Sequence, residues 1–252
     1  MSAVFRESAI ALAPPFLDDL GRVALFLDID GTLLELQPRP RDVAADERLC
    51  ALLRALEQRV GGALAILTGR SLPDADRILR GSVRCVAALH GNDCRLHRGV
   101  LRQKAAQPSW LAAKEIVRKL VQSGALAAEL EDKGRALALH YRARPEQGAL
   151  IIRAVDEIAA RHGLRALHGK MVSELLPFGA DKGVALSTFM QAPPFYGRVP
   201  VAVGDDLTDE DAFRAAGALG GVSVLVGSRE NSAARYALAD AQAVRAWLGA
   251  AL

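Results

Sequence analysis

Cysteine is scarce in this sequence of 252 residues, which contains only Cys50, Cys85 and Cys94. These residues are widely spaced and form no Cys-x-x-Cys pair, so neither a disulfide framework nor a zinc knuckle is expected. Because structural disulfides belong to oxidising compartments, this cysteine usage favours a reducing environment. We therefore expect a cytoplasmic protein.

Long apolar runs and a strong charge of one sign are also lacking. No apolar run approaches the roughly 20 residues that a membrane-spanning helix requires, so no membrane partner is expected. The net charge is +3 and the basic residues are spread along the chain, so no nucleic acid partner is expected. With 51% hydrophobic residues, the chain is too apolar to be disordered. We expect a soluble globular protein, either a monomer or a weak homo-oligomer.

Apolar runs alternate with amphipathic segments at both ends of the chain. The runs typical of buried strands are 23–29, 63–67, 83–89, 199–203 and 222–226. The segments with helical spacing are 46–59, 73–79, 182–190, 209–216 and 241–248. Strands that alternate with helices require crossover connections, which predicts a doubly wound α/β sheet of the Rossmann-like kind.

The middle of the chain has a different order of elements. Its predicted helices are 108–122 and 145–162, and its predicted strands are 125–131, 135–142, 165–167 and 172–176. The order helix, two strands, helix, two strands is typical of an α+β module with an antiparallel sheet. We therefore predict a core formed by residues 1–105 and 178–252, interrupted by an α+β domain at 106–177.

Two aspartates, Asp28 and Asp30, follow the first predicted strand. Residues two apart on a strand point to the same side, so both carboxylates project where a parallel strand ends and where open α/β sheets bind ligands. Gly31 allows a tight turn beside a ligand, and Thr32 adds a hydroxyl. Adjacent acids repel each other unless a cation or a shared proton intervenes, which suggests Mg²⁺. Taken alone, the motif is equally compatible with a turn or a helix cap.

A second acidic cluster follows the predicted strand 199–203. Asp205, Asp206 and Asp209 lie at the strand end and at the start of the next helix. Acids in the first turn of a helix are explained by capping, but capping does not require Asp205 and Asp206 before it. Two acid clusters at two strand ends of one sheet predict a divalent cation site with oxygen ligands.

Two further residues complete the predicted site. Thr68 ends the predicted strand 63–67, where its hydroxyl can donate to a phosphate, although alone it would be read as a turn residue. Lys182 begins a predicted helix, where the dipole disfavours a cation, so its ammonium is expected to serve an anion. Two acids, a hydroxyl, a cation and further acids suit phosphoryl transfer to an aspartate.

The chain resembles the haloacid dehalogenase-like superfamily of phosphohydrolases, whose motifs it matches in order. The matching segments are Asp28-x-Asp30-Gly31-Thr32, Thr68, Lys182 and Gly204-Asp205-Asp206-x-x-Asp209. The resemblance implies that Asp28 is the nucleophile and that Asp30 is the general acid and base. It also implies that Thr68 and Lys182 hold phosphoryl oxygens. Mg²⁺ would be bound by Asp28, the carbonyl of Asp30 and Asp205, with Asp206 or Asp209 acting through water.

Strings outside these motifs resemble the trehalose-6-phosphate phosphatase family from about Leu25 to Leu248. They are Leu67-Thr-Gly-Arg70, Leu89-His-Gly91, Glu129-Leu-Glu-Asp-Lys-Gly134, Leu139-His-Tyr-Arg142, Glu174-x-x-Pro177 and Gly197-Arg-Val-Pro200. The resemblance implies that the inserted domain is a cap that grips the sugar. The implied substrate-binding residues are Gly31, Thr32, Gly69, Arg70, His90, Gly91, Glu131, Lys133, His140, Arg142 and Glu174. Asn92 and Asp93 depart from the family pattern, which leaves the role of their loop open.

The predicted activity is that of a phosphoric monoester hydrolase acting on trehalose 6-phosphate. Three alternatives stay open at this point. One is a phosphatase for another sugar phosphate, such as sucrose 6-phosphate or a glucosylglycerate phosphate. Another is a sugar phosphomutase, which also needs a proton carrier at Asp30. The last, a catalytically silent domain, is disfavoured because Asp28, Asp30 and Asp205 are all present.

Overall fold

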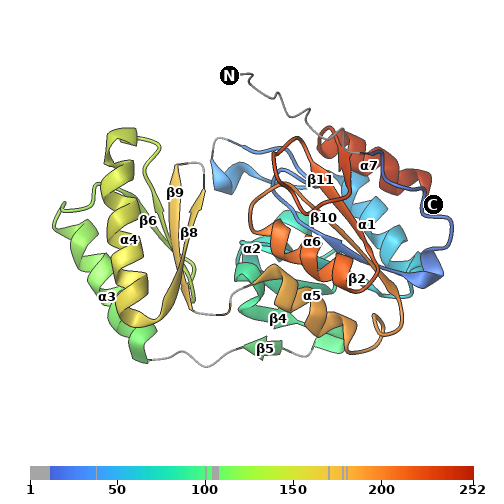
Figure 1. Cartoon of the computed structure of the whole chain (residues 1–252), viewed down its shortest axis with the longest axis horizontal. Coiled ribbons are helices and arrows are strands. Elements are labelled where there is room, and N and C mark those ends of the chain that lie inside the picture. Colours follow the sequence, from blue (N-terminus) through green and yellow to red (C-terminus); the bar gives the residue numbers. More distant parts are fainter. Residues whose placement is uncertain are drawn as a thin grey trace, which may run out of the picture.

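The structure is a computed structural model of the chain (Figure 1). It describes residues 12–37, 39–99, 101–103, 108–169, 171–177, 179 and 181–252. The predicted boundary at 105–106 lies outside the described residues, and so does residue 178, where the second piece of the core was expected to begin. Among the described residues, no helix is both long enough and apolar enough to cross a membrane.

A large sheet runs through the part of the molecule built from both ends of the chain. Its strands, in spatial order, are β12 (Tyr236–Leu238), β11 (Val222–Val226), β10 (Val199–Gly204), β1 (Val23–Leu27), β2 (Leu64–Leu67), β3 (Cys85–Ala88), β4 (Asp93–Arg95) and β5 (Leu101–Gln103). The strands from β12 to β3 are parallel, and β4 and β5 are antiparallel additions. Strand β1 is buried between β10 and β2, with Leu27 opposite both Val203 and Ile66.

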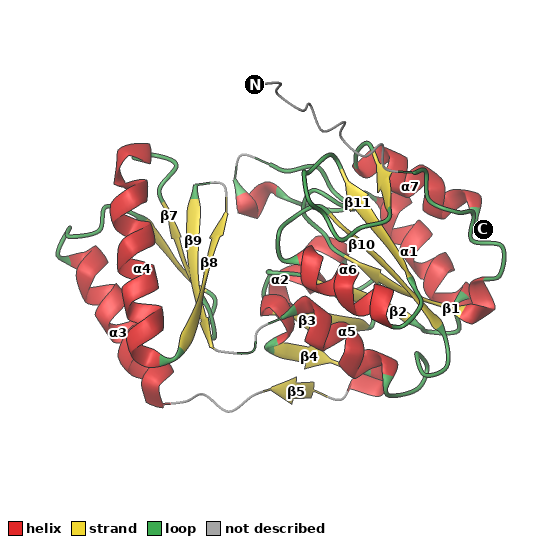
Figure 2. Cartoon of the chain, in the orientation of Figure 1, coloured by secondary structure: helices red, strands yellow, loops and turns green. Residues whose placement is uncertain are grey.

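Helices cover both faces of this sheet, as Figure 2 shows. On one face, α5 (Lys182–Met190) packs against α6 (Asp209–Ala218). On the other face, α1 (Glu47–Arg59) packs against α7 (Ala241–Ala250), and α2 (Leu72–Leu79) contacts α1 through Cys50 Sγ, which donates to the carbonyl of Leu79. The apolar runs became buried strands because both faces of the sheet are covered. The predicted doubly wound α/β fold is confirmed.

The middle of the chain forms a smaller antiparallel sheet. Its strands, in spatial order, are β6 (Glu129–Asp132), β7 (Leu137–His140), β9 (Val172–Pro177) and β8 (Leu164–Gly169). The helices α3 (Pro108–Gln122) and α4 (Gly148–His162) cover the face that points away from the large sheet (Figure 1). Apolar side chains at alternate strand positions, such as Leu137, Leu139 and Leu175, pack against these helices around Trp110. The opposite face carries polar residues and is turned toward the core.

Several predicted elements differ from the observed ones. The predicted strand 125–131 is reduced to β6, because Leu126 leaves a turn at Gly124 and enters the apolar core instead. The predicted strand 135–142 is reduced to β7, because a turn closed by the bond from Arg144 N to Tyr141 O follows it. Strands β4, β5 and β12 were not predicted. Each has three residues, which is too short for an alternation of polar and apolar residues to be recognised in the sequence.

Candidate active site

Three predicted site residues lie side by side at the carboxyl edge of the large sheet. Asp28, Thr68 and Asp205 each directly follow the last residue of β1, β2 and β10, respectively. The chain continues from β1 to β2 on one side, whereas β10 joins β1 from the other side. Ligands of open α/β sheets bind in the crevice at such a switch point. The sequence prediction that the two acidic clusters meet there agrees with the fold.

Three carboxylates converge at this edge around one ammonium group. Oxygens of Asp28, Asp205 and Asp209 lie within 4.8 Å of one another. Lys182 is 2% exposed, and its Nζ donates to Asp28 Oδ1 at 2.9 Å and to Asp209 Oδ1 at 2.8 Å. A Cβ on Gly31 would lie 2.1 Å from Asp205 Oδ2, so only glycine leaves room for that carboxylate. The cluster is therefore held tightly by the backbone around it.

Burial and mutual repulsion set the protonation of this cluster. Burial, followed by the repulsion of Asp209, raises the pKa of Asp205 to about 7. Burial also raises the pKa of Asp28 well above its usual value, and the attraction of Lys182 offsets only part of the rise. Burial opposes the charged form of Lys182, but the attraction of Asp209 and Asp28 outweighs it and leaves its pKa raised. The site thus holds more negative charge than one lysine neutralises.

The structure separates the two aspartates that the sequence treated as equivalent. Asp209, at the first turn of α6, is buried and forms a carboxylate triad with the buried Asp28 and the half-buried Asp205. Its Oδ2 accepts from the backbone N of Asp205 and Asp206. The side chain of Asp206 is 54% exposed, and its Oδ1 accepts from the backbone N of Leu207. Thr32 Oγ1 donates to Asp205 Oδ1 at 3.1 Å. Hard cations prefer such clusters of carboxylate oxygens, so Asp28, Asp205 and Asp209 fit a divalent cation.

Asp30 lies beside the cluster and is held by a guanidinium group. Arg70 Nε donates to Asp30 Oδ2 at 2.8 Å, and its Nη2 donates to Oδ1 at 2.6 Å. The side chain of Asp30 is 25% exposed. Thr68 Oγ1 accepts from the backbone N of Arg70 at 3.1 Å, which leaves the hydroxyl proton to donate. Arg70 therefore links the loop after β2 to the loop after β1.

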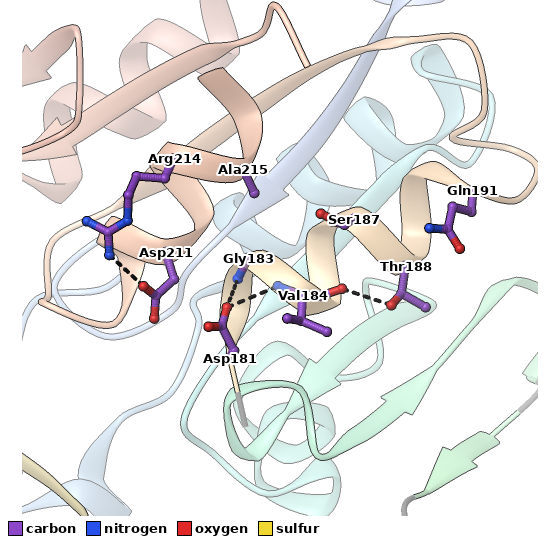
Figure 3. Close-up of a pocket in the computed structure, with 9 residues that line it drawn as sticks. All are labelled: Asp181, Gly183, Val184, Ser187, Thr188, Gln191, Asp211, Arg214 and Ala215. Carbon is purple, nitrogen blue, oxygen red and sulfur yellow. Dashed lines mark hydrogen bonds and ion pairs between the residues drawn. The ribbon is translucent and has the colours of Figure 1, made fainter. Parts of the chain in front are cut away.

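Lys182 is the first residue of α5, and Figure 3 shows the start of this helix at Asp181 and Gly183. Asp181 caps the helix, since its Oδ1 accepts from the backbone N of Gly183 at 2.7 Å and of Val184 at 3.0 Å. A Cβ on Gly183 would lie 2.4 Å from the carbonyl oxygen of Asp211, so glycine permits the close approach of α5 and α6. The groove of about 390 Å³ that Figure 3 shows lies along these helices, and none of the reacting residues lines it.

A left-handed turn follows β3 and faces the inserted domain. The φ angles of Leu89, His90 and Gly91 are +48°, +54° and +95°. Left-handed conformations of residues other than glycine are costly and collect at functional sites. The backbone N of Leu89 donates to Arg70 O, and that of His90 donates to Thr68 O, both at 2.9 Å. These two hydrogen bonds connect the turn to the loop that carries Thr68 and Arg70.

The inserted domain meets this turn through a charged cluster and a small apolar contact. His90 Nε2 lies 3.1 Å from Glu174 Oε2, and Lys133 Nζ donates to Glu174 Oε1 at 2.6 Å. Lys133 Nζ also donates to the carbonyl of Gly69 at 3.4 Å. Burial opposes ionisation of Glu174, but the attraction of Lys133 and the hydrogen bond with His90 outweigh it and keep its pKa well below the usual range. Leu89 packs beside the cluster against Ala136 and Leu176.

Two other predicted cap residues form a second pair on the same face. His140 Nε2 lies 2.9 Å from Glu131 Oε2, and the hydrogen bond with His140 lowers the pKa of Glu131. Arg142 was expected on the same strand as His140, and this expectation is wrong. Strand β7 ends at His140, and Arg142 lies exposed in the turn that leads to Pro145. The structure thus brings together Glu131, Lys133, His140 and Glu174, and it places Arg142 beyond the strand.

Two contacts between the domains were missed from sequence. Arg165 in β8 donates to Asp211 Oδ2 in α6 at 3.1 Å, and Arg135 donates to Asp93 Oδ1 in β4 at 3.4 Å. Asp93 is one of the two residues that depart from the family pattern. Its ion pair with Arg135 connects the loop after His90 to the inserted domain. No sequence spacing connects residues 42 or 46 positions apart, so only the fold reveals these pairs.

We expect Glu174→Gln to lower the free energy of unfolding by about 3 kcal/mol at pH 7, because it leaves Lys133, whose side chain is only 11% exposed, without its carboxylate. A carboxyl with a lowered folded-state pKa stabilises the fold above its unfolded pKa of about 4.3, and this stability is lost as the pH falls further. The wild type should therefore lose more stability than the variant between about pH 5 and pH 3. Urea unfolding at several pH values measures both effects. Glu157→Gln, in an exposed helical pair with Arg161, should change stability by less than about 0.5 kcal/mol, and equal acid slopes would contradict the assignment.

Comparisons with known proteins assign the chain to a family. A family model described as trehalose-phosphatase matches residues 26–242. The chain is 40% identical over 228 residues to the probable trehalose-phosphate phosphatase of Sinorhizobium fredii, covering 87% of this chain and 85% of that protein. It is 36% identical over 230 residues to the trehalose-6-phosphate phosphatase of Escherichia coli, covering 90% and 85%.

A solved structure supports the fold along the whole length. The chain is similar to the C-terminal domain of the trehalose-6-phosphate phosphatase of C. albicans, with a TM-score of 0.81 at 21% identity, covering 96% of this chain and 98% of that one. The resemblance seen in the sequence motifs is confirmed by the family match over residues 26–242. The chain belongs to the trehalose-phosphatase family.

Proposed function

We propose that this chain hydrolyses trehalose 6-phosphate to trehalose and phosphate through an aspartyl-phosphate on Asp28. The observation that carries the proposal is the position of Asp28 at the switch point of the sheet, 2.9 Å from Lys182 Nζ, in a chain of the trehalose-phosphatase family. In the first step, a carboxylate oxygen of Asp28 attacks phosphorus and the bond to the sugar oxygen breaks. In the second step, water attacks the aspartyl-phosphate, which releases phosphate and regenerates the carboxylate.

The proton for the leaving sugar oxygen comes from Asp30 in this proposal. Asp30 lies two residues after the nucleophile, and Arg70 orients its carboxyl group through two hydrogen bonds. After the first step, the carboxylate of Asp30 takes a proton from the attacking water. Lys182 and the hydroxyl of Thr68 hold the phosphoryl oxygens. The ammonium of Lys182 offsets the charge that would otherwise keep a phosphate dianion away from Asp28.

The metal that we propose is Mg²⁺, held by the carboxylates of Asp28 and Asp205 and by the main-chain oxygen of Asp30. Asp209 supports it from the carboxylate triad, and Asp206 stands outside that triad. When bound, the ion supplies positive charge that neutralises the phosphoryl oxygens and lowers the repulsion between the carboxylates. Burial and the repulsion of Asp209 raise the pKa of Asp205 to about 7, and a bound cation would favour its charged carboxylate.

The inserted domain supplies the sugar specificity. We propose that residues 106–177 form a cap over a catalytic core of 1–105 and 178–252. The polar face of the cap sheet carries Glu131, Lys133, His140 and Glu174 and contacts the core at Gly69 and His90. Such side chains can bind sugar hydroxyls. Closure of the cap excludes bulk water from the aspartyl-phosphate. We propose that the substrate is a small sugar phosphate. We also propose that the protein acts in the cytoplasm.

The test is phosphate release from a panel of sugar phosphates with and without Mg²⁺. We expect trehalose 6-phosphate to be the best substrate, and we expect chelation to stop turnover and added Mg²⁺ to restore it. A preference for sucrose 6-phosphate or for a glucosylglycerate phosphate would overturn the substrate assignment. An isomerised sugar phosphate with no free phosphate would instead indicate a phosphomutase.

A further inference from the structure

A pocket of about 310 Å³ opens between the core and the cap, and charged side chains alone line it. The lining residues are Arg41, Arg70, Asp74, Arg77 and Glu131. Arg41 comes from the turn η2 (Pro40–Asp42), Asp74 and Arg77 come from α2, and Glu131 comes from β6 of the cap. The core therefore forms most of this wall, and Arg41, Asp74 and Arg77 are not among the substrate-binding residues that the sequence resemblance implied.

The pocket adjoins the reaction centre through one shared residue. Arg70 lines the pocket and also binds both carboxylate oxygens of Asp30. Glu131 lines it from the cap and is hydrogen-bonded to His140, so the pocket continues into the polar face of the cap sheet. A sugar phosphate whose phosphorus lies at Asp28 has its leaving oxygen beside Asp30. Because Arg70 contacts Asp30 and also lines the pocket, the pocket is within reach of a sugar attached to that oxygen.

The composition of the wall suits a polyol. Three guanidinium groups and two carboxylates line the pocket, so the wall offers both hydrogen-bond donors and acceptors. Sugar hydroxyls both donate and accept, and they pair well with charged groups of either sign. An apolar ligand would leave these charges unpaired at a large cost. The two carboxylates offset two of the three guanidinium charges, so the lining as a whole carries only one net positive charge. A volume of about 310 Å³ is at the lower end of small-molecule sites.

The side chains of α2 are held in place before a ligand arrives. Ser71 Oγ donates to Asp74 Oδ2 at 2.9 Å and accepts from the backbone N of Asp74 at 3.3 Å. Arg77 Nη1 donates to the carbonyl of Val43 at 3.4 Å, and its Nε lies 3.6 Å from Asp74 Oδ1. Such preorganisation lowers the cost of binding, because fewer side-chain rotamers have to be fixed.

We propose that this pocket is a subsite for the sugar part of the substrate and that Arg41, Asp74 and Arg77 determine specificity from the core side. The proposal rests on the phosphatase reaction proposed above and adds the core wall to its sugar site. These three residues act on the sugar hydroxyls and take no part in the chemistry at phosphorus. Substitution of these residues should therefore lower kcat/KM for a sugar phosphate and leave kcat/KM for a phosphate ester without a sugar unchanged.

The experiment compares two substrates in Arg77→Gln and, separately, in Arg41→Gln. The substrates are the sugar phosphate that the wild type turns over best and p-nitrophenyl phosphate, which carries no sugar. We expect kcat/KM for the sugar phosphate to fall about tenfold in each variant, the loss expected for one hydrogen bond to a charged group. We expect kcat/KM for p-nitrophenyl phosphate to stay within about twofold. Arg48→Gln, an exposed charge on α1, is the matched control and should change neither.

A second measurement uses the uncharged sugar alone. Trehalose should inhibit hydrolysis of p-nitrophenyl phosphate competitively, with an inhibition constant raised about tenfold in Arg77→Gln. An unchanged inhibition constant would overturn the subsite, because Arg77 would then not contact the sugar. Equal losses of kcat/KM for both substrates would also overturn it, because the arginines would then act on the phosphate. Thermal unfolding of each variant separates such losses from misfolding. If the wild type prefers a sugar phosphate other than trehalose 6-phosphate, the proposed function fails, and the two-substrate comparison still decides the subsite.

Discussion

Asp28→Asn is expected to lower phosphate release by about 10⁴-fold or more, with the fold retained. An amide is a far weaker nucleophile than a carboxylate, so the attack on phosphorus is lost rather than slowed. The fold should survive because Lys182 keeps its 2.8 Å contact with Asp209. The neutral amide also removes a charge whose ionisation burial already disfavours, as the raised pKa of Asp28 indicates. We expect the free energy of unfolding to change by less than about 1 kcal/mol.

The measurement combines steady-state phosphate release with acid-quench trapping of labelled phosphoenzyme. The wild type should accumulate an acid-stable acyl phosphate label, and Asp28→Asn should accumulate none. Asp18→Asn removes the same charge from an exposed position and serves as the control, with activity within about twofold of the wild type. If Asp28→Asn kept more than a hundredth of the activity, another residue would have to be the nucleophile.

The reaction centre was predictable because its residues lie at the ends of long, buried strands. The apolar runs before Asp28, Thr68 and Asp205 are continuous, and strands covered on both faces give this strong signal. Parallel strands then place their carboxyl ends at one edge, so a local pattern was enough to join residues 177 positions apart in sequence, as Asp28 and Asp205 are. Asp28 and Asp205 at that edge form the carboxylate triad with Asp209 of α6.

The sugar side of the site was less predictable because it depends on the docking of two domains. The contact of His90 with Glu174 spans 84 positions, and no period in the sequence relates them. The left-handed turn at Leu89 and His90 has no glycine signal at either residue. Asp206 and Asp209 differ in burial only because the turn before α6 directs one side chain outward. Arg41 and Arg77 are ordinary surface arginines in sequence, and only the fold places them at a pocket.

The same physical cause explains why the reaction centre was predictable from the sequence and why the contacts between the two domains were not. Burial of a strand between two layers leaves a long imprint on the sequence, because every residue of the strand is constrained. A polar contact across a domain interface constrains only its two partners, and each of these residues is individually compatible with a solvated surface. Resemblance to a family supplied the cap residues that composition and spacing could not. It gave their identities, and the structure gives their pairings.

Lys182→Met is expected to abolish activity and to lower the free energy of unfolding by about 3–5 kcal/mol at pH 7. Lys182 is the ammonium group that pairs with Asp28 and Asp209, and methionine leaves those buried carboxylates to repel each other and Asp205. Lys119→Met, at an exposed helical pair with Glu115, is the control and should cost less than about 0.5 kcal/mol. Urea unfolding at several pH values, with and without Mg²⁺, is the measurement.

The pH dependence distinguishes lost charge from lost packing. Without the lysine, the folded-state pKa values of the cluster rise further, so the folded state binds more protons than the unfolded state above about pH 4. The deficit relative to the wild type should therefore shrink as the pH falls from 7 toward 4. Mg²⁺ at a hundredfold excess over its dissociation constant should return about 2.7 kcal/mol of stability at pH 7, while activity stays absent because no ammonium holds the phosphate. A deficit that is equal at every pH and insensitive to Mg²⁺ would mean that Lys182 stabilises the fold by packing, and the electrostatic account of this site would be wrong.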